Sequence, residues 1–252
     1  MTTLVGLSSG SAPALGAAEL ARLTLELGGT AVDVRAGKGH AWEQGGLAGL
    51  RAAGVGVCFV GIGTVLGGAA HPLPAAADLD QLEPGLPVKV FAAEGCTAPE
   101  AFDRTRQQIQ ELAARVGGTE RVLVETHHGY APVPELLELC ERTGVRILLD
   151  SLGLARIHPD PAAAAARLAP WTSYAQVKGF DWASPGSNGH LPLALSCAGP
   201  TRELLAAAGP LRAVTVESKA GALAEDMALL LDWYAPAPAP APASSPALSE
   251  RP

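Results

Sequence analysis

Short apolar runs alternate with amphipathic stretches from one end of the chain to the other. The runs are rich in β-branched and aliphatic side chains and are bounded by Gly or Pro, which is typical of strands buried on both faces. We predict eight such strands, at residues 4–7, 31–35, 55–60, 88–91, 122–125, 146–150, 173–178 and 213–217.

The stretches between these runs have the apolar spacing of helices. Several begin with Pro and end near Gly, which favours helix starts and stops at those points. The predicted helices cover residues 14–27, 43–53, 99–116, 134–143, 161–168, 201–208 and 222–233. Eight strands alternating with helices predict a parallel sheet closed into a single α/β (β/α)8 TIM barrel. Residues 61–87 form the weakest unit, with at most a short helical turn expected.

The chain ends in a different composition. From residue 235 Ala and Pro alternate, and this pattern prevents both helix formation and strand pairing. We therefore predict one barrel domain at residues 1–234 and a disordered tail at residues 235–252, which is either an inert extension or a docking segment. A chain of 252 residues is an ordinary size for one such barrel.

Four short apolar runs late in the chain each end in a residue that can bind a metal ion: Glu125, Asp150, Gln176 and Glu217. A carboxylate is costly in a buried strand unless it lies where the strand leaves the core, and these ends are where barrel enzymes build active sites. Three carboxylates and an amide suit a hard cation, Mg²⁺ or Mn²⁺, with Zn²⁺ or Co²⁺ as alternatives. Each residue taken alone could instead cap a helix or form a salt bridge.

Composition excludes several kinds of partner. The net charge of −7 argues against a nucleic-acid surface, and no apolar stretch reaches membrane length. The four cysteines lie far apart, which predicts free or buried thiols instead of a disulfide frame. With no leader pattern either, we expect a cytoplasmic protein that binds neither nucleic acid nor membrane.

The polar strand ends and their neighbours resemble the xylose isomerase-like barrels, a superfamily of sugar isomerases, epimerases, inosose dehydratases and endonuclease IV enzymes. The resemblance covers residues 4–233, and the order and spacing of short motifs carry it: Glu125-Thr126-His127-His128-Gly129, Leu148-Leu149-Asp150, Tyr174-Ala175-Gln176-Val177-Lys178 and Val214-Thr215-Val216-Glu217. Most members have His at position 176 and Asp at 179, where this chain has Gln and Gly. The hydroxypyruvate isomerase branch is similar in having Gln as this ligand.

The resemblance implies a metal-dependent isomerase or epimerase of a small sugar or hydroxy-keto acid, acting through an enediolate. It implies that Glu125 and Glu217 exchange protons with the substrate while also binding the metal. Candidate substrate contacts are His40, Lys178, His127 and Trp182, and Trp42 is a second tryptophan near the same rim. Relatives often pair, so a homo-oligomer is compatible with the resemblance.

Three departures favour a different interpretation. Sugar epimerases of this type usually carry a substrate-contacting His at the position of Gly153, and Gln176 and Gly179 stand where most members have His and Asp. The alternative is therefore a catalytically degenerate barrel that binds a small polar ligand or a partner without turnover. An abasic-site endonuclease needs many His ligands and a basic surface, and this acidic chain has six scattered histidines. His71 and His190 are assigned to loops.

Overall fold

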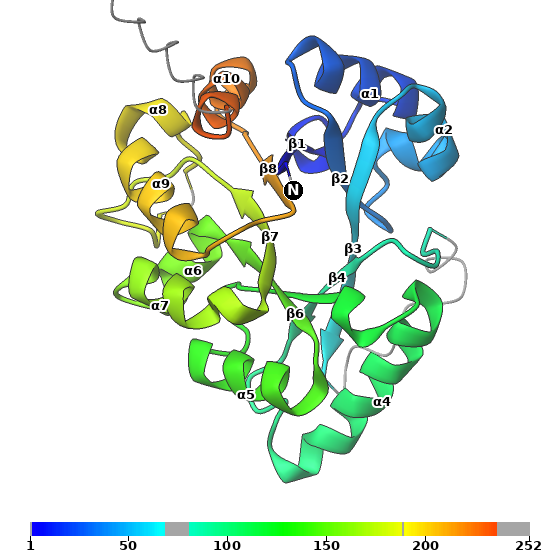
Figure 1. Cartoon of the computed structure of the whole chain (residues 1–252), viewed down its shortest axis with the longest axis vertical. Coiled ribbons are helices and arrows are strands. Elements are labelled where there is room, and N and C mark those ends of the chain that lie inside the picture. The colour runs from blue at the N-terminus through cyan, green and yellow to red at the C-terminus, as the bar shows by residue number, and fades with distance from the viewer. Residues whose placement is uncertain (1, 69–80, 188, 236–252) are drawn as a thin grey trace, which may run out of the picture.

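Eight parallel strands close into a barrel surrounded by helices (Figure 1). The computed structural model describes residues 2–68, 81–187 and 189–235. Each strand pairs with its sequence neighbours and the last pairs with the first, which confirms the predicted TIM barrel. The strands are β1 (Leu4–Ser8), β2 (Ala31–Arg35), β3 (Gly56–Leu66), β4 (Val88–Ala92), β5 (Val122–Glu125), β6 (Arg146–Asp150), β7 (Thr172–Val177) and β8 (Ala213–Val216).

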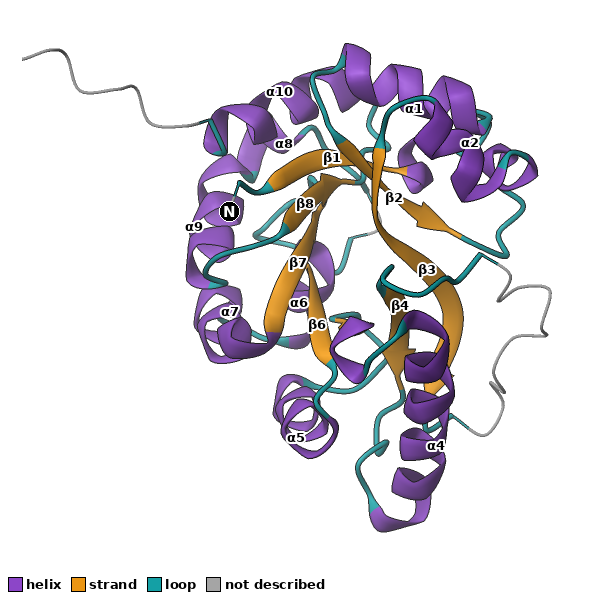
Figure 2. Cartoon of the chain, turned by 45° about the vertical axis from the view of Figure 1, so that its right-hand side comes forward, coloured by secondary structure: helices purple, strands orange, loops and turns teal. Residues whose placement is uncertain are grey.

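The helices form the outer layer of the molecule (Figure 2). They are α1 (Ala17–Glu26), α2 (Gly46–Ala52), α4 (Pro99–Val116), α5 (Val133–Thr143), α6 (Ser151–Ile157), α7 (Pro161–Leu168), α8 (Leu193–Ser196), α9 (Ala198–Ala207) and α10 (Leu223–Trp233). Short 3-10 turns are η1 (Ser9–Ser11), η2 (Ala41–Gln44), η3 (Thr119–Arg121) and η4 (Ala169–Trp171). Within the described ranges, no helix combines the length and apolar character needed to cross a bilayer.

Some element boundaries differ from the prediction. The third strand continues to Leu66, and its register against β4 shifts between Gly61 and Val65. The helix predicted at 43–53 is two elements, η2 and α2, which meet at Gly45. The short helices α6 and α8 are additions. The predicted tail lies outside the described residues from 236 onward, as does His71.

Apolar side chains fill the lower part of the barrel interior. Ala31, Cys58, Phe59, Leu123, Leu148 and Ala213 form a buried cluster, and Tyr174 packs its ring edge-on against Phe59. A separate, larger core lies between the sheet and the helices. All four cysteines are buried and free, as predicted.

The same strands that build this apolar layer also build a polar one. Side chains two residues apart on a strand point to the same face. Glu125 follows Leu123 by two positions, and Asp150 follows Leu148 in the same way. The strands therefore present polar groups toward their C-terminal ends, directly beyond the apolar layer.

Candidate active site

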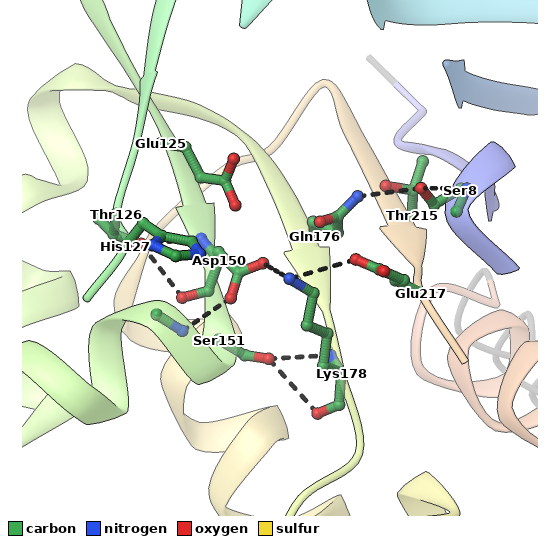
Figure 3. A network of polar contacts seen from close by, with 12 residues as sticks. Ser8, Glu125, Thr126, His127, Asp150, Ser151, Gln176, Lys178, Thr215 and Glu217 are labelled. Carbon is green, nitrogen blue, oxygen red and sulfur yellow. Dashed lines mark hydrogen bonds and ion pairs between the residues drawn. The ribbon is translucent and has the colours of Figure 1, made fainter. Parts of the chain in front are cut away.

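The structure gathers three carboxylates at the C-terminal mouth of the barrel (Figure 3). Glu125 and Asp150 end β5 and β6, and Glu217 directly follows β8, where its backbone N–H donates to Val177. Each carboxylate residue is at most 3% exposed. Charges buried this deeply are stable only when paired.

Lys178 is the centre of this pairing. Its Nζ lies 2.6 Å from Asp150 Oδ2 and 3.2 Å from Glu217 Oε2, so one ammonium bridges two carboxylates (Figure 3). Burial alone would lower the pKa of Lys178, but the carboxylates of Asp150, Glu217 and Glu125 raise it above its ordinary value. Lys178 is therefore a protonated, positively charged group at neutral pH.

Three further basic side chains complete the charge balance. Lys89 Nζ lies 2.5 Å from Glu125 Oε2, Arg35 Nη2 lies 2.5 Å from Glu217 Oε2, and Lys219 Nζ lies 3.0 Å from Glu217 Oε1. None of these three residues is among the site residues predicted from the sequence. A signal existed for Lys89, because it interrupts the apolar run at 88–91, and for Arg35, because it ends the second predicted strand.

Gln176 belongs to a neighbouring network. Its Nε2 donates to Asp33 Oδ2 at 3.0 Å and to Ser8 Oγ at 3.2 Å. Asp33 also accepts from Ser8 at 2.7 Å and from Thr215 at 2.5 Å. Asp33 is buried, and its burial raises its pKa although these hydrogen bonds and Arg35 lower it. The side-chain amide is thus held across the barrel, toward β1 and β2.

The arrangement does not fit a resident divalent cation. All three carboxylates of the predicted ligand set contact basic side chains, and Lys178 fills the gap between two of them. Among the described residues, no group of three or more His, Cys, Asp or Glu side chains is placed to hold a metal ion. The predicted metal site therefore stays a prediction. The placement of its four donor residues, Glu125, Asp150, Gln176 and Glu217, does not support it.

The predicted substrate contacts lie around this cluster. The ring of His127 packs edge-on against Phe91, with ring centroids 5.3 Å apart, and stacks on His128, with centroids 4.4 Å apart. His40 Nδ1 lies 3.3 Å from Ser9 Oγ, and burial together with the nearby Arg35 lowers its pKa. Both rings are partly exposed, so they remain candidates for contact with a bound molecule.

The two tryptophans have different environments. Trp182 packs on Phe180 with ring centroids 4.8 Å apart and is partly exposed. Trp42 is only 1% exposed, and its Nε1 donates to the backbone oxygen of Arg35 at 3.2 Å. Trp42 therefore supports the strand that carries Arg35 and cannot stack on a substrate.

Solved structures share this architecture, whereas no protein-family model and no curated protein sequence matches the chain. A xylose isomerase-like TIM barrel/4-hydroxyphenylpyruvate dioxygenase fusion protein superposes with a TM-score of 0.67 at 14% identity, over 92% of this chain and 43% of that one. The chain therefore shares its barrel fold with these solved structures. The 3-keto-D-glucoside 4-epimerase of E. coli matches with a TM-score of 0.61 at 17% identity, covering 92% and 98% of the two chains. The probable 3-DHS dehydratase of Bacillus anthracis matches with a TM-score of 0.61 at 16% identity, covering 90% and 98%.

The chain departs from the pattern of the family that it resembles at two glycines, for a steric reason. A Cβ at Gly153 would lie 1.9 Å from the backbone oxygen of Thr126, and a Cβ at Gly179 would lie 1.9 Å from that of Leu191. Gly153 also donates its N–H to Asp150 Oδ1 at 2.7 Å. The backbone thus occupies the space that the family's His and Asp would need.

Alanine at position 153 is expected to destabilise the barrel. Its methyl group would collide with the backbone oxygen of Thr126, so α6 must shift away from β5. We expect the free energy of unfolding to fall by about 1–3 kcal/mol, measured by urea denaturation. Gly199→Ala is the matched control, because a Cβ there meets nothing within 4 Å. Equal stability of the two variants would contradict the close approach.

The pH dependence of stability follows from the charges around Glu217. Burial raises the pKa of Glu217, but Lys178, Arg35 and Lys219 together hold it well below its ordinary value of 4.5. The carboxylate therefore stabilises the fold fully above pH 4.5, and this contribution is lost as the pH falls toward the folded-state pKa. The stability difference between the wild type and Glu217→Gln should be constant near neutral pH and shrink in acid. A stability difference that grows as the pH falls would contradict this prediction.

Proposed function

We propose that this barrel is an isomerase or epimerase that moves a proton on a small hydroxy-carbonyl compound, such as a sugar or a keto acid. One observation carries the proposal. Two buried carboxylates, Glu125 and Glu217, share one cluster with the protonated Lys178, which contacts Glu217 and is also influenced by the charge of Glu125 (Figure 3). A proton acceptor, a proton donor and a fixed positive charge are the groups that such a reaction needs.

The reaction follows from these roles. One glutamate takes the proton from the carbon next to the substrate carbonyl, and the electron pair moves onto the carbonyl oxygen to give an enediolate. Lys178, with Lys89 and Arg35 nearby, stabilises that negative charge. The other glutamate takes up a proton from solvent when the substrate binds and delivers it to the neighbouring carbon or to the opposite face, while the first glutamate releases its proton to solvent. Proton transfer of this kind typically contributes on the order of 10²–10⁴-fold to the rate.

Substrate binding would also prepare the base. In the free protein, basic side chains outweigh the effect of burial and lower the pKa of both Glu125 and Glu217, which makes the carboxylates weak bases. A carbonyl oxygen that takes a hydrogen bond from Lys178 draws the ammonium away from Glu217. This weakens the ion pair and raises the basicity of the carboxylate where the proton must be removed.

Unsatisfied polar atoms at the edge of the cluster support a polar ligand. Trp182 Nε1, His190 Nδ1 and Ser218 Oγ are buried without a hydrogen-bond partner among the described residues. His190 lies in the loop between β7 and α8; burial lowers its pKa, and the charges of Glu217, Lys219 and Lys178 also act on it. Leaving such atoms unpaired costs about 1–3 kcal/mol each, which substrate hydroxyl groups would recover.

The substrate class is inferred from the structures that share the fold. They include an L-ribulose 3-epimerase and a 3-keto-D-glucoside 4-epimerase, both of which act on carbohydrates. Screening ketoses, keto-glycosides and hydroxy-keto acids by NMR tests the proposal. We expect interconversion of at least one pair of isomers or epimers. A protein that binds members of the panel but converts none would instead be the degenerate barrel.

A further inference from the structure

The place of Lys178 in the site has a consequence for the cofactor. Its Nζ contacts Asp150 on β6 and Glu217 after β8, two members of the predicted metal-ligand set that come from different strands. Distances of 2.6 and 3.2 Å leave no room for a metal ion between the same oxygens. A divalent cation and this ammonium therefore compete for one position.

Other contacts hold Lys178 in this position. Its backbone N–H donates to Ser151 Oγ at 2.9 Å, and its side chain is only 10% exposed. The following residue, Gly179, packs against the backbone of Leu191, whose N–H donates to the Gly179 oxygen at 3.0 Å. The lysine is thus anchored on both sides of its Cα.

The remaining carboxylates are also compensated. Lys89 contacts Glu125, while Arg35 and Lys219 contact Glu217. With Asp33 included, the cluster holds four carboxylates and four basic side chains, so their formal charges balance without an added cation. Adding a doubly charged ion would require at least one buried ammonium to leave, at a cost in desolvation and repulsion.

We propose that the ammonium of Lys178 occupies the position of the divalent cation, and that this barrel works without a resident metal. The ammonium then supplies the positive charge for the substrate oxygen, a role that rests on the proposed function. The exclusion of the metal does not rest on it, because it follows from the ion pairs alone. Lysine is a compact point charge, which suits this replacement.

Titration of the full chain with Mn²⁺ tests the proposal without using activity. We expect wild-type protein to show no binding by calorimetry up to roughly 1 mM, a weak-binding limit for protein sites. In Lys178→Met the carboxylates of Asp150 and Glu217 lose the ammonium that they share. We therefore expect this variant to bind Mn²⁺ at least about tenfold more tightly than the wild type. Mn²⁺ should also raise the melting temperature of this variant and leave that of the wild type unchanged.

Lys219→Met is the matched control. Lys219 contacts the same glutamate, but its side chain is 50% exposed and it does not bridge two carboxylates. Its removal should leave Mn²⁺ affinity at the wild-type level. If Lys178→Met fails to fold, Lys178→Gln replaces it, since the amide can still donate to Asp150.

Two results would overturn the proposal. One is tight Mn²⁺ binding by the wild type that is lost in Asp150→Asn, which would show a resident metal site. The other is a folded Lys178 variant that binds Mn²⁺ no better than the wild type. Neither result depends on turnover, so failure here is distinct from failure of the isomerase assignment.

Discussion

Replacing Lys178 with methionine is expected to lower the free energy of unfolding by about 3–5 kcal/mol, the usual cost of breaking a buried ion pair. The side chain is 10% exposed and bridges Asp150 and Glu217, which are each 1% exposed. Methionine has a similar length and fills the same space. The loss of stability is therefore due to the missing charge and not to a change in side-chain volume. Urea denaturation at neutral pH measures it.

The loss should depend on pH in a defined direction. Burial raises the pKa of Asp150, and the positive charge of Lys178 opposes that rise. Without the lysine, Asp150 takes up a proton more readily, so Lys178→Met should lose less stability in mild acid than at neutral pH. Lys219→Met should cost only about 0–1 kcal/mol, because exposed pairs contribute little. Equal losses in the two variants would contradict the central position of Lys178.

Replacing Glu217 with glutamine is expected to lower turnover by about 10²–10⁴-fold, because the amide can neither take nor return a proton. The substitution keeps the size of the side chain and leaves one oxygen to accept from Arg35 or Lys219. The variant should therefore keep the circular dichroism spectrum of the wild type. Initial rates with the substrate identified by NMR measure the effect.

An isosteric control separates chemistry from charge. Glu138 lies on α5 and contacts Arg142 at 2.7 Å, outside the cluster at the barrel mouth. Glu138→Gln removes one negative charge in the same way and should retain wild-type turnover. Full activity in Glu217→Gln would remove this glutamate from the mechanism, whereas a loss in both variants would point to a general effect of charge.

Much of the fold could be predicted from the periodicity of the chain. Strands β2, β5 and β6 and helices α4 and α7 have the predicted bounds, because their apolar runs or Pro and Gly boundaries are sharp. The extension of β3 through Gly61 and Gly63 could not be predicted, since glycine-rich sequence favours a loop. Helix α8 has four residues, too few for helical spacing to be visible.

The candidate site was only half predictable for a related reason. Glu125, Asp150 and Glu217 could be predicted because each closes an apolar run. Asp33 and Lys89 instead lie within their strands. Both interrupt apolar runs at an inward position, and the cost of burying a charge marks them in the sequence. The partner of each carboxylate is not visible there, because Lys89 meets Glu125 and Arg35 meets Glu217 only when the barrel closes. The packing of Gly153 against Thr126 is equally non-local.

Deuterium incorporation from solvent tests the central claim most directly. The wild-type protein is incubated in D₂O with the substrate found in the panel, and the product is read by NMR. Proton transfer through Glu125 and Glu217 predicts one deuterium on the carbon next to the carbonyl, and no incorporation above background with Glu217→Gln. A converted product that carries no solvent deuterium would contradict proton transfer by these two carboxylates.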